Sequence, residues 1–199
     1  MGTGKSTVGR RLAERTGRTF VDIDQVIETK HGPIEHIFAD GGEAAFRAFE
    51  RQAVSDVAPL RNHVISTGGG TLLDDENVIA LAGAEIITLT ATPEAIVERV
   101  SADGLSQRPL LADADDPLAE VERLLAERQD SYDRFTVIDT TGQTVDEIIA
   151  SIGAAGIDVT TPVVAEPEGG PSSAEKTLYA IITALMIVLL VIIAVIIAV

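Results

Sequence analysis

The chain has 199 residues, with 31 acidic and 15 basic side chains and no cysteine. This length allows one domain of about 150 residues plus an extension. The absence of cysteine excludes disulfides, thiol catalysis and cysteine-bound zinc. The formal net charge of −16 argues against general nucleic-acid binding, which requires a positive surface.

The first residues predict a phosphate-binding loop. The run G-T-G-K-S-T at 2–7 matches the distal part of the pattern G-x-x-x-x-G-K-[ST]. Its glycines let backbone amides turn toward phosphate oxygens, Lys5 supplies a positive charge, and Ser6 offers a hydroxyl to Mg²⁺. A helix expected over 5–16 presents its positive end to the same anion. A plain glycine-rich helix cap accounts for the run less well, because a cap requires neither Lys5 nor Ser6.

Two parts of the usual loop pattern are not in this sequence. The full pattern has another glycine two residues before Met1, and a buried strand leads into it. We expect either that the first strand of the domain has been lost or that the true start lies upstream of Met1. Such a strand would lie in the middle of a parallel sheet, and without it both neighbouring strands would have unpaired backbone groups.

A short strand is expected over 19–22, and it ends at a pair of carboxylates, Asp22 and Asp24. In an open α/β sheet, ligands collect beyond the carboxyl ends of the strands. Two carboxylates there, opposite a phosphate loop, can hold a metal ion and accept a proton. Asp24 could instead only cap the next short helix, which we expect to run through Ile27. The spacing from the loop favours the functional interpretation.

A helix is expected over 43–57, with Glu43, Arg47 and Glu50 forming a charged stripe on it. Two interpretations of this stripe stay open. It is either a solvated face whose ion pairs are worth a few tenths of a kcal/mol each, or a site where Glu50 orients Arg47 toward an anionic substrate.

A strand expected over 63–67 runs into three successive glycines at 68–70. Glycines have no side chain, so their backbone amides can approach a ligand. A flexible turn is the alternative, but three glycines at the end of a strand lose much conformational entropy on folding, which favours contact with a ligand.

The remaining expected elements continue the alternation of helices and strands. They are a helix over 74–81, a buried strand over 84–89, a helix over 93–100, a mobile lid over 101–115, a helix from 117 to 128–131, a strand over 135–139 and a helix from the capping box of Thr144 and Glu147 to 153–156. This alternation predicts a three-layer α/β fold with helices on both faces of a parallel sheet. The sheet would have four strands, or five with the strand missing before Met1.

The C-terminal part has a different composition. Residues 156–177 are rich in Pro, Gly, Glu, Ser and Thr, which predicts a linker. Residues 178–199 carry no charge, and as a helix they would span roughly 30 Å, the thickness of the hydrocarbon core of a membrane. We therefore expect a transmembrane tail anchor, with Lys176 favouring a cytoplasmic position for the domain. A buried core helix fits an all-round apolar run less well, and association as strands is a further alternative.

Together these segments resemble the shikimate kinase family over about residues 1–152. The resemblance rests on an ordered set of motifs: G-T-G-K-S-T-V-G, D-I-D, G-E-x-x-F-R-x-F-E, V-I-S-T-G-G-G, R-P-L-L, E-R-Q-D-S-Y and V-I-D-T. It implies a P-loop kinase fold, five-stranded in the family, at 1–155. It also implies transfer of the γ-phosphoryl group of ATP, with Mg²⁺, to a hydroxyl of shikimate in the route to chorismate and aromatic amino acids.

The resemblance also implies roles for individual residues. The ATP-binding residues would come from the loop, the lid and the end of the domain: Gly2, Thr3, Gly4, Lys5, Ser6, Thr7, Arg108 and Gln143. The shikimate-binding residues would follow the strands or lie on helices: Asp24, Arg47, Gly68, Gly69, Gly70 and Arg128.

Within these sets the resemblance implies distinct tasks. Asp24, Lys5 and Arg108 would be catalytic, with Asp24 taking the proton of the attacking hydroxyl. Ser6 would bind Mg²⁺ directly, and Asp22 would lie in the outer shell of the ion. Arg47 and Arg128 would clamp the carboxylate, and Gly69 would contact the ring most directly.

Three accounts of function follow from the sequence. The first is an ATP-dependent shikimate kinase with a monomeric kinase domain, tethered to a membrane by its tail. The second is a related small-molecule kinase, such as a gluconate kinase, against which the triple glycine and the two arginines argue. The third is a catalytically impaired, membrane-tethered remnant, motivated by the missing strand.

Overall fold

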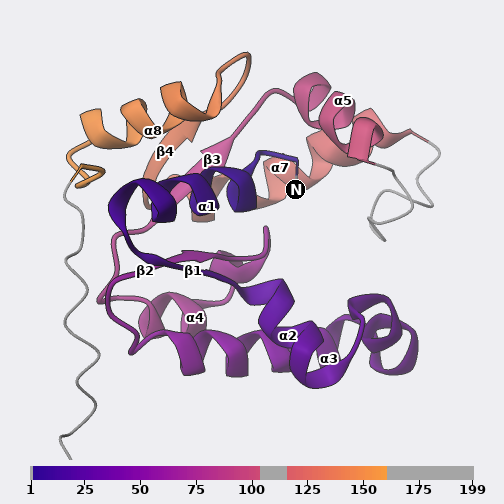
Figure 1. The fold of residues 1–199 in the computed structure, drawn as a ribbon. Coiled ribbons are helices and arrows are strands. Elements are labelled where there is room, and N and C mark those ends of the chain that lie inside the picture. The colour runs from indigo at the N-terminus through magenta and orange to yellow at the C-terminus, as the bar shows by residue number, and fades with distance from the viewer. Residues whose placement is uncertain (1, 104–115, 161–199) are drawn as a thin grey trace, which may run out of the picture. The chain divides into compact units, whose positions relative to one another are not determined.

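The computed structural model describes residues 2–103 and 116–160, all within one compact unit of the chain (Figure 1). Most of the predicted lid, with Arg108, lies outside the described residues, as do most of the predicted linker and the whole predicted tail at 178–199. In the part of the chain that is described, no helix is long and apolar enough to cross a membrane.

The first half of the unit contains these elements in order: α1 (Lys5–Thr16), β1 (Thr19–Asp22), α2 (Ile23–His31), α3 (Ile34–Val57) and β2 (His63–Ser66). Helix α1 has the predicted bounds. It begins after Gly4 and ends at Gly17, both with left-handed backbone angles, and the Gly17 amide donates to carbonyls of the last turn.

Two helices in this half are longer than predicted. Helix α2 continues past Ile27 to His31, where Gly32 ends it. Helix α3 begins at Ile34 rather than at Glu43. Gly42, with a φ of 67° and non-helical backbone angles, separates α3 into two helical stretches, so the predicted start at Glu43 is confirmed for the second stretch and only the first stretch was not predicted.

The second half contains η1 (Thr71–Leu73), α4 (Asp75–Ala80), β3 (Ile87–Thr90), α5 (Pro93–Asp103), α7 (Pro117–Tyr132), β4 (Thr136–Asp139) and α8 (Val145–Ala154). Strand β3 starts later than the predicted Ala84, because the Ala84 amide still donates to the Leu81 carbonyl in the turn after α4. The capping box that begins α8 is confirmed, since Thr144 and Glu147 bond each other's backbone amides.

The described strands form two separate parallel pairs instead of one sheet. Strand β1 pairs with β2, and β3 pairs with β4, each over four residues. The predicted parallel orientation is confirmed, but the prediction of a single continuous sheet is wrong for these residues. Each of the four described strands pairs along one edge only, so each pair leaves two strand edges without a ladder among the described residues.

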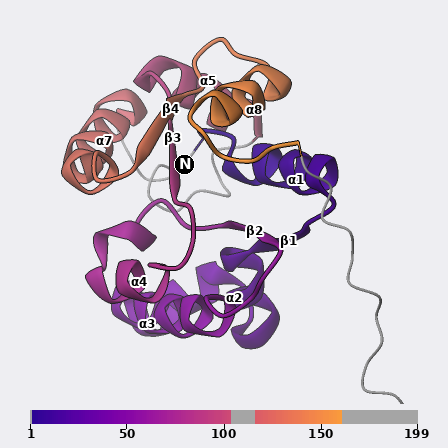
Figure 2. The ribbon, with the colours of Figure 1, turned by 90° about the vertical axis from the view of Figure 1, so that its left-hand side faces the viewer.

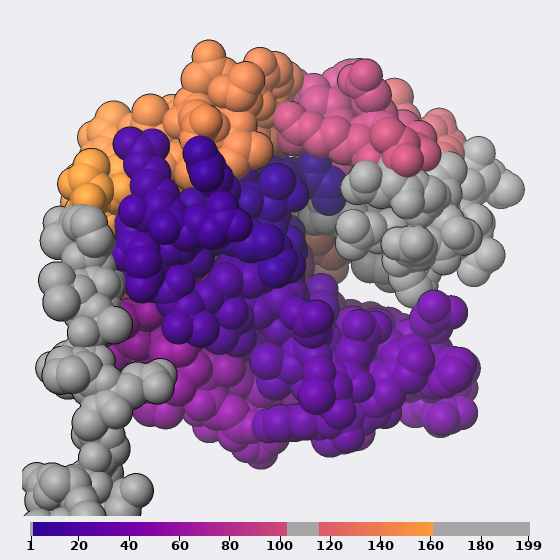
Figure 3. Space-filling model, viewed as in Figure 1, coloured from indigo at the N-terminus to yellow at the C-terminus, as the bar shows by residue number. Residues whose placement is uncertain are grey.

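The hydrophobic core is divided in the same way. One cluster joins α2, α3 and α4 to β1 and β2, and a second joins α1 and α8 to β3 and β4. A third lies between α5 and α7. Helix α1 contacts the β1–β2 pair and also α8, so it bridges the two strand pairs (Figures 2 and 3). Where α1 crosses the β1–β2 pair, a Cβ on Gly9 would lie only 2.8 Å from the Phe20 ring, so glycine allows this close packing.

Candidate active site

The phosphate loop turns as its glycines predict. Gly2 and Gly4 have φ angles of 67° and 83°, in the left-handed region that favours glycine. A Cβ on Gly2 would also meet Val100 of α5 at 2.9 Å. The loop leads directly into the twelve-residue helix α1, whose first turn carries Lys5, with Ser6 and Thr7 exposed beside it. This is the geometry of an anion site at a helix N-terminus.

Ser6 connects the loop to the end of β1. Its hydroxyl donates to the Asp22 carboxylate at 2.7 Å and lies 3.3 Å from the hydroxyl of Ser66, the last residue of β2. The other Asp22 oxygen accepts the Asp24 amide at 3.1 Å, which makes Asp22 the cap of α2. The alternative in which Asp24 only caps this helix is therefore wrong.

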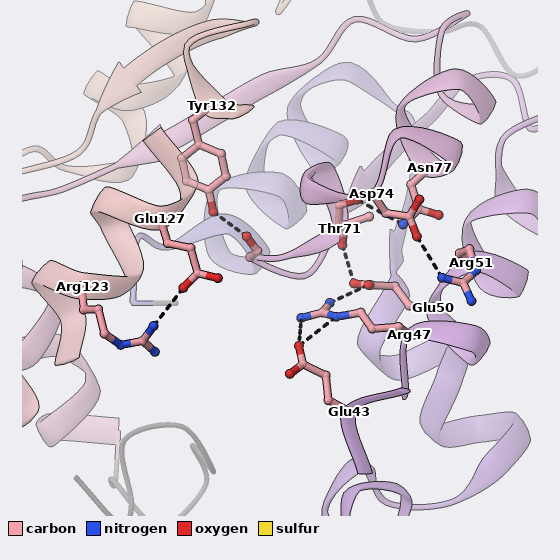
Figure 4. Close-up of polar contacts among 11 residues, drawn as sticks. Glu43, Arg47, Glu50, Arg51, Thr71, Asp74, Asn77, Arg123, Glu127 and Tyr132 are labelled. Atoms are coloured by element: carbon pink, nitrogen blue, oxygen red, sulfur yellow. Dashed lines mark hydrogen bonds and ion pairs between the residues drawn. The ribbon is translucent and has the colours of Figure 1, made fainter. Parts of the chain in front are cut away.

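Arg47, which is partly exposed, and the buried Glu50 form an ion pair. Glu50 is 0% exposed, and its carboxylate accepts a bond of 2.6 Å from Arg47 Nη1 (Figure 4). The remaining face of the guanidinium donates to the exposed Glu43 at 3.0 and 3.2 Å. Burial opposes the charge of Arg47, but the hydrogen bonds and charges of Glu50 and Glu43 outweigh it and raise the pKa of the guanidinium. Of the charged stripe of Glu43, Arg47 and Glu50, only Glu43 is therefore part of a solvated face. Glu50 is buried and orients Arg47.

A second partner, which sequence reasoning missed, holds Glu50 from the other side. The Thr71 hydroxyl donates to Glu50 Oε1 at 2.6 Å, and the Thr71 carbonyl accepts from the Asn77 amide group at 3.1 Å. All three side chains are buried. This network ties the segment after the glycines to α3.

Close packing accounts for two of the three glycines. A Cβ on Gly68 would lie 2.8 Å from Glu50 Oε1 and 3.6 Å from Asp24 Oδ1. A Cβ on Gly70 would lie 2.5 Å from Arg47 Nη2. The backbone therefore runs directly between the predicted proton acceptor and the predicted carboxylate clamp, and a side chain there would displace them.

Helix α7 brings Arg128 and Tyr132 to the same region. The Tyr132 hydroxyl donates to the Gly69 carbonyl at 2.7 Å (Figure 4). Arg128 is only 8% exposed, and among the described residues its Nε has no hydrogen-bond partner. The Thr3 hydroxyl also has no hydrogen-bond partner among the described residues. Both side chains line one small cavity, together with Leu89, Ile96, Val121, Leu124, Leu125 and Tyr132.

The predicted site residues are therefore connected in space, with two exceptions. Contacts run from Ser6 through Asp22 to Asp24, then through the glycines to Arg47, and through Tyr132 to α7 and Arg128. Gln143 donates to the Asp139 carbonyl in its own turn at 2.8 Å, so its contact with adenine stays a prediction. Arg108 lies outside the described residues.

Arg99 of α5 is a further residue near the loop that sequence reasoning missed. Its guanidinium donates to the hydroxyl and carbonyl of Thr140 at 2.9 and 2.7 Å, and to the Gly2 carbonyl at 3.3 Å. It therefore fixes the start of the phosphate loop against the segment after β4. No motif in the sequence marks it.

The structure combines parallel strands, a glycine-rich loop that leads into a helix, and arginines and a carboxylate near that loop. This combination is typical of P-loop kinases that act on small molecules. The sequence matches the family described as shikimate kinase over residues 1–155, and the chain belongs to that family.

Individual relatives agree with this assignment. The chain is 39% identical over 156 residues to a shikimate kinase of Caldanaerobacter subterraneus subsp. tengcongensis, covering 76% of this chain and 89% of the relative. It is 42% identical over 155 residues to one of Geobacter metallireducens, covering 76% and 85%. The solved shikimate kinase of Acinetobacter baumannii, in complex with shikimate, superposes with a TM-score of 0.70 at 32% identity and covers 79% and 91%.

Proposed function

We propose that this chain transfers the γ-phosphoryl group of ATP to a hydroxyl of shikimate, giving 3-phosphoshikimate and ADP. The observation that carries the proposal is that hydrogen bonds join the phosphate loop to Asp22 and Asp24, and that Asp24 and the Arg47–Glu50 pair lie on either side of Gly68. Membership of the shikimate kinase family supports the same reaction. Gluconate phosphorylation has no support from the comparisons.

The substrate carboxylate would be held by Arg47 and Arg128. Glu50 already occupies one nitrogen of Arg47, and the exposed Glu43 carboxylate occupies the other two. Glu43 is held only on the surface, so a substrate carboxylate can replace it in the same two-point geometry. Arg128 is buried, and its Nε has no hydrogen-bond partner among the described residues, so it is a charged donor on α7 that a carboxylate would satisfy.

Asp24 would act as the proton acceptor. As the shikimate hydroxyl oxygen bonds to the γ-phosphorus, the bond from that phosphorus to the β–γ bridging oxygen breaks and ADP leaves. The hydroxyl proton passes to the Asp24 carboxylate. Lys5 and the loop amides would hold the phosphates in place, and Arg108 would close over them from the lid. Most of the rate enhancement in phosphoryl transfer comes from such positioning and from charge neutralisation.

Ser6 and Asp22 fit a Mg²⁺ ion that arrives with the nucleotide. Both supply oxygen ligands, 2.7 Å apart, at the edge of the phosphate loop. In the described residues no group of three His, Cys, Asp or Glu side chains could form a metal cage of its own. This suits Mg²⁺, which keeps several waters and binds through few protein ligands plus substrate phosphates. When bound, it would neutralise charge on the phosphates.

A coupled ADP-release assay with shikimate and with gluconate tests the proposal. We expect turnover with shikimate and none with gluconate, and turnover with gluconate alone would contradict it. Asp24→Asn is expected to lower kcat by at least about a hundredfold, in the range for loss of a general base. The matched control is Asp56→Asn, which removes an exposed carboxylate that pairs with Lys30 and Gln52 on the surface.

We also propose that residues 178–199, which lie outside the described residues, anchor this kinase to a membrane. Their length, the absence of charge and the near absence of polar side chains support a membrane-spanning helix. The full chain is expected to sediment with membranes and float with lipid, whereas a chain ending at residue 177 is not. Recovery of both chains in the same fraction would contradict the anchor.

A further inference from the structure

Tyr132 makes a hydrogen bond between the two halves of the unit. It is the last residue of α7, which precedes β4, while its acceptor Gly69 lies in the glycine loop after β2. The two residues are 63 positions apart, and their strand pairs share no ladder. The hydroxyl therefore fixes the glycine loop to α7 at a point where no sheet connects the two halves of the described unit.

The loop that Tyr132 holds is the same one that packs on Arg47. The Gly69 carbonyl belongs to the planar peptide that joins Gly69 to Gly70, so a bond to this carbonyl sets the orientation of the whole peptide. Gly70, at the other end of that peptide, lies against the Arg47 guanidinium. One turn before Tyr132 on the same helix face is Arg128, close enough to influence the phenol.

We infer that Tyr132 is a positioning residue for substrate binding, whose hydroxyl sets the spacing between Arg47 and Arg128 by holding the Gly69–Gly70 peptide against α7. This inference rests on the proposed function, in which the two arginines hold one carboxylate. In this role Tyr132 would act through the two arginines and not on the substrate itself. Its hydroxyl can donate only while protonated, and burial, opposed by Arg128, raises the pKa of the phenol, so the bond persists through the neutral range.

The variant Tyr132→Phe tests this role, because it removes the hydroxyl and keeps the ring. Loss of the hydrogen bond leaves the Gly69 carbonyl without this donor and lets the loop shift relative to Arg128. We expect KM for shikimate to rise roughly tenfold, in line with the usual effect of one such bond, while KM for ATP changes less than about twofold. Isothermal titration with shikimate should show the same loss, independently of turnover.

Thr88→Val is the matched control. The Thr88 hydroxyl lies 3.4 Å from the Tyr132 carbonyl and 3.3 Å from the Thr136 carbonyl, so it ties the same end of α7 to β3 and β4 without touching the glycines. This variant should lower the melting temperature and leave KM for shikimate unchanged. Melting curves for both variants show whether each one is folded at the assay temperature.

The outcomes separate the inference from the proposed function. If the wild-type chain phosphorylates shikimate but Tyr132→Phe keeps the wild-type KM, the inference is overturned and the function stands. An equal rise of KM in both variants also overturns it, because loosening of α7 would then be the cause. A wild-type chain that neither binds nor phosphorylates shikimate overturns both.

Discussion

The Arg47 guanidinium lies directly against the backbone of Gly70, where a Cβ atom would be 2.5 Å from Nη2. Gly70→Ala should therefore displace Arg47 from its place beside Glu50. We expect KM for shikimate to rise at least about tenfold, comparable to losing one charge-assisted hydrogen bond, with little change in KM for ATP. Steady-state kinetics with each substrate varied in turn measure both effects.

Gly83→Ala provides the control for this prediction. Gly83 also lies outside the regular elements, but a Cβ there would meet nothing within 4 Å. This variant should have wild-type kinetics. A Gly70→Ala enzyme with an unchanged KM for shikimate would show that Arg47 does not hold the substrate in this position.

The Arg47–Glu50 pair should also be important for stability. Arg47→Met leaves the Glu50 carboxylate fully buried with Thr71 as its remaining hydrogen-bond donor. Removing one partner of a buried ion pair lowers the free energy of unfolding by about 3 kcal/mol or more. Because Arg47 is partly exposed, we expect a loss of about 2 kcal/mol here. Urea denaturation measures it. Glu43→Gln removes the exposed partner of Arg47 and should change the free energy of unfolding by less than about 0.5 kcal/mol. Equal losses in the two variants would show that the pair with Glu50 is no more important for stability than the pair with Glu43.

Stability at low pH should depend on Asp74. The hydrogen bond from Arg51 is the largest factor that holds the pKa of Asp74 below its ordinary value of 3.8, and the bond from the Glu76 amide adds to it. A carboxyl whose pKa is lower in the folded state stabilises the fold above its unfolded pKa, and this stabilisation is lost as the pH falls through the folded value. Asp74→Asn should therefore have a lower melting temperature than the wild type near neutral pH. Below about pH 4 the difference between the two melting temperatures should become smaller. A difference that stays constant between neutral and acid pH would contradict this linkage.

Features of the fold that depend on local sequence could be predicted, and those that depend on distant contacts could not. The ends of α1 follow from Gly4 and Gly17, and the start of α8 follows from Thr144 and Glu147, because each signal lies within one turn of its effect. The helical stretch of α3 before Gly42 was missed, although the predicted start at Glu43 agrees with the break at Gly42.

The same limit applies to the site. Its motif positions could be predicted because Lys5, Asp24 and Arg47 belong to short, characteristic runs. The burial of Glu50 could not, because a charged stripe has the same spacing whether it faces solvent or the core. Tyr132 stands inside a quoted motif, four residues after Arg128, but its acceptor is 63 positions away, so nothing near it in the sequence indicates the bond.

The unpaired edges of β2 and β3 lead to a last prediction. Each strand has four residues and a ladder on one side only, and Val64 of β2 packs against the core cluster of β3 and β4. Thr3 lines a cavity with Leu89 of β3, so the residues just before α1 lie beside one of these edges. An extension joined in front of Met1, with an apolar, valine-rich run of the same length as β2 followed by the missing loop glycine and one further residue, could therefore pair with both strands at once.

Such an extension is expected to stabilise the fold, and each kcal/mol of added stability should raise the melting temperature by roughly 3 °C. ATP should then raise the melting temperature of the extended chain by more than that of the original chain, because the phosphate loop would be held at both ends. A Gly-Ser extension of equal length is the control, since it lengthens the chain without strand propensity. Equal melting temperatures for the two extensions would show that the two edges do not accept a common strand. If neither extended chain, nor the chain without an extension, responds to ATP, the catalytically impaired alternative gains support over the kinase, because a kinase of this class must bind its nucleotide before any transfer can occur.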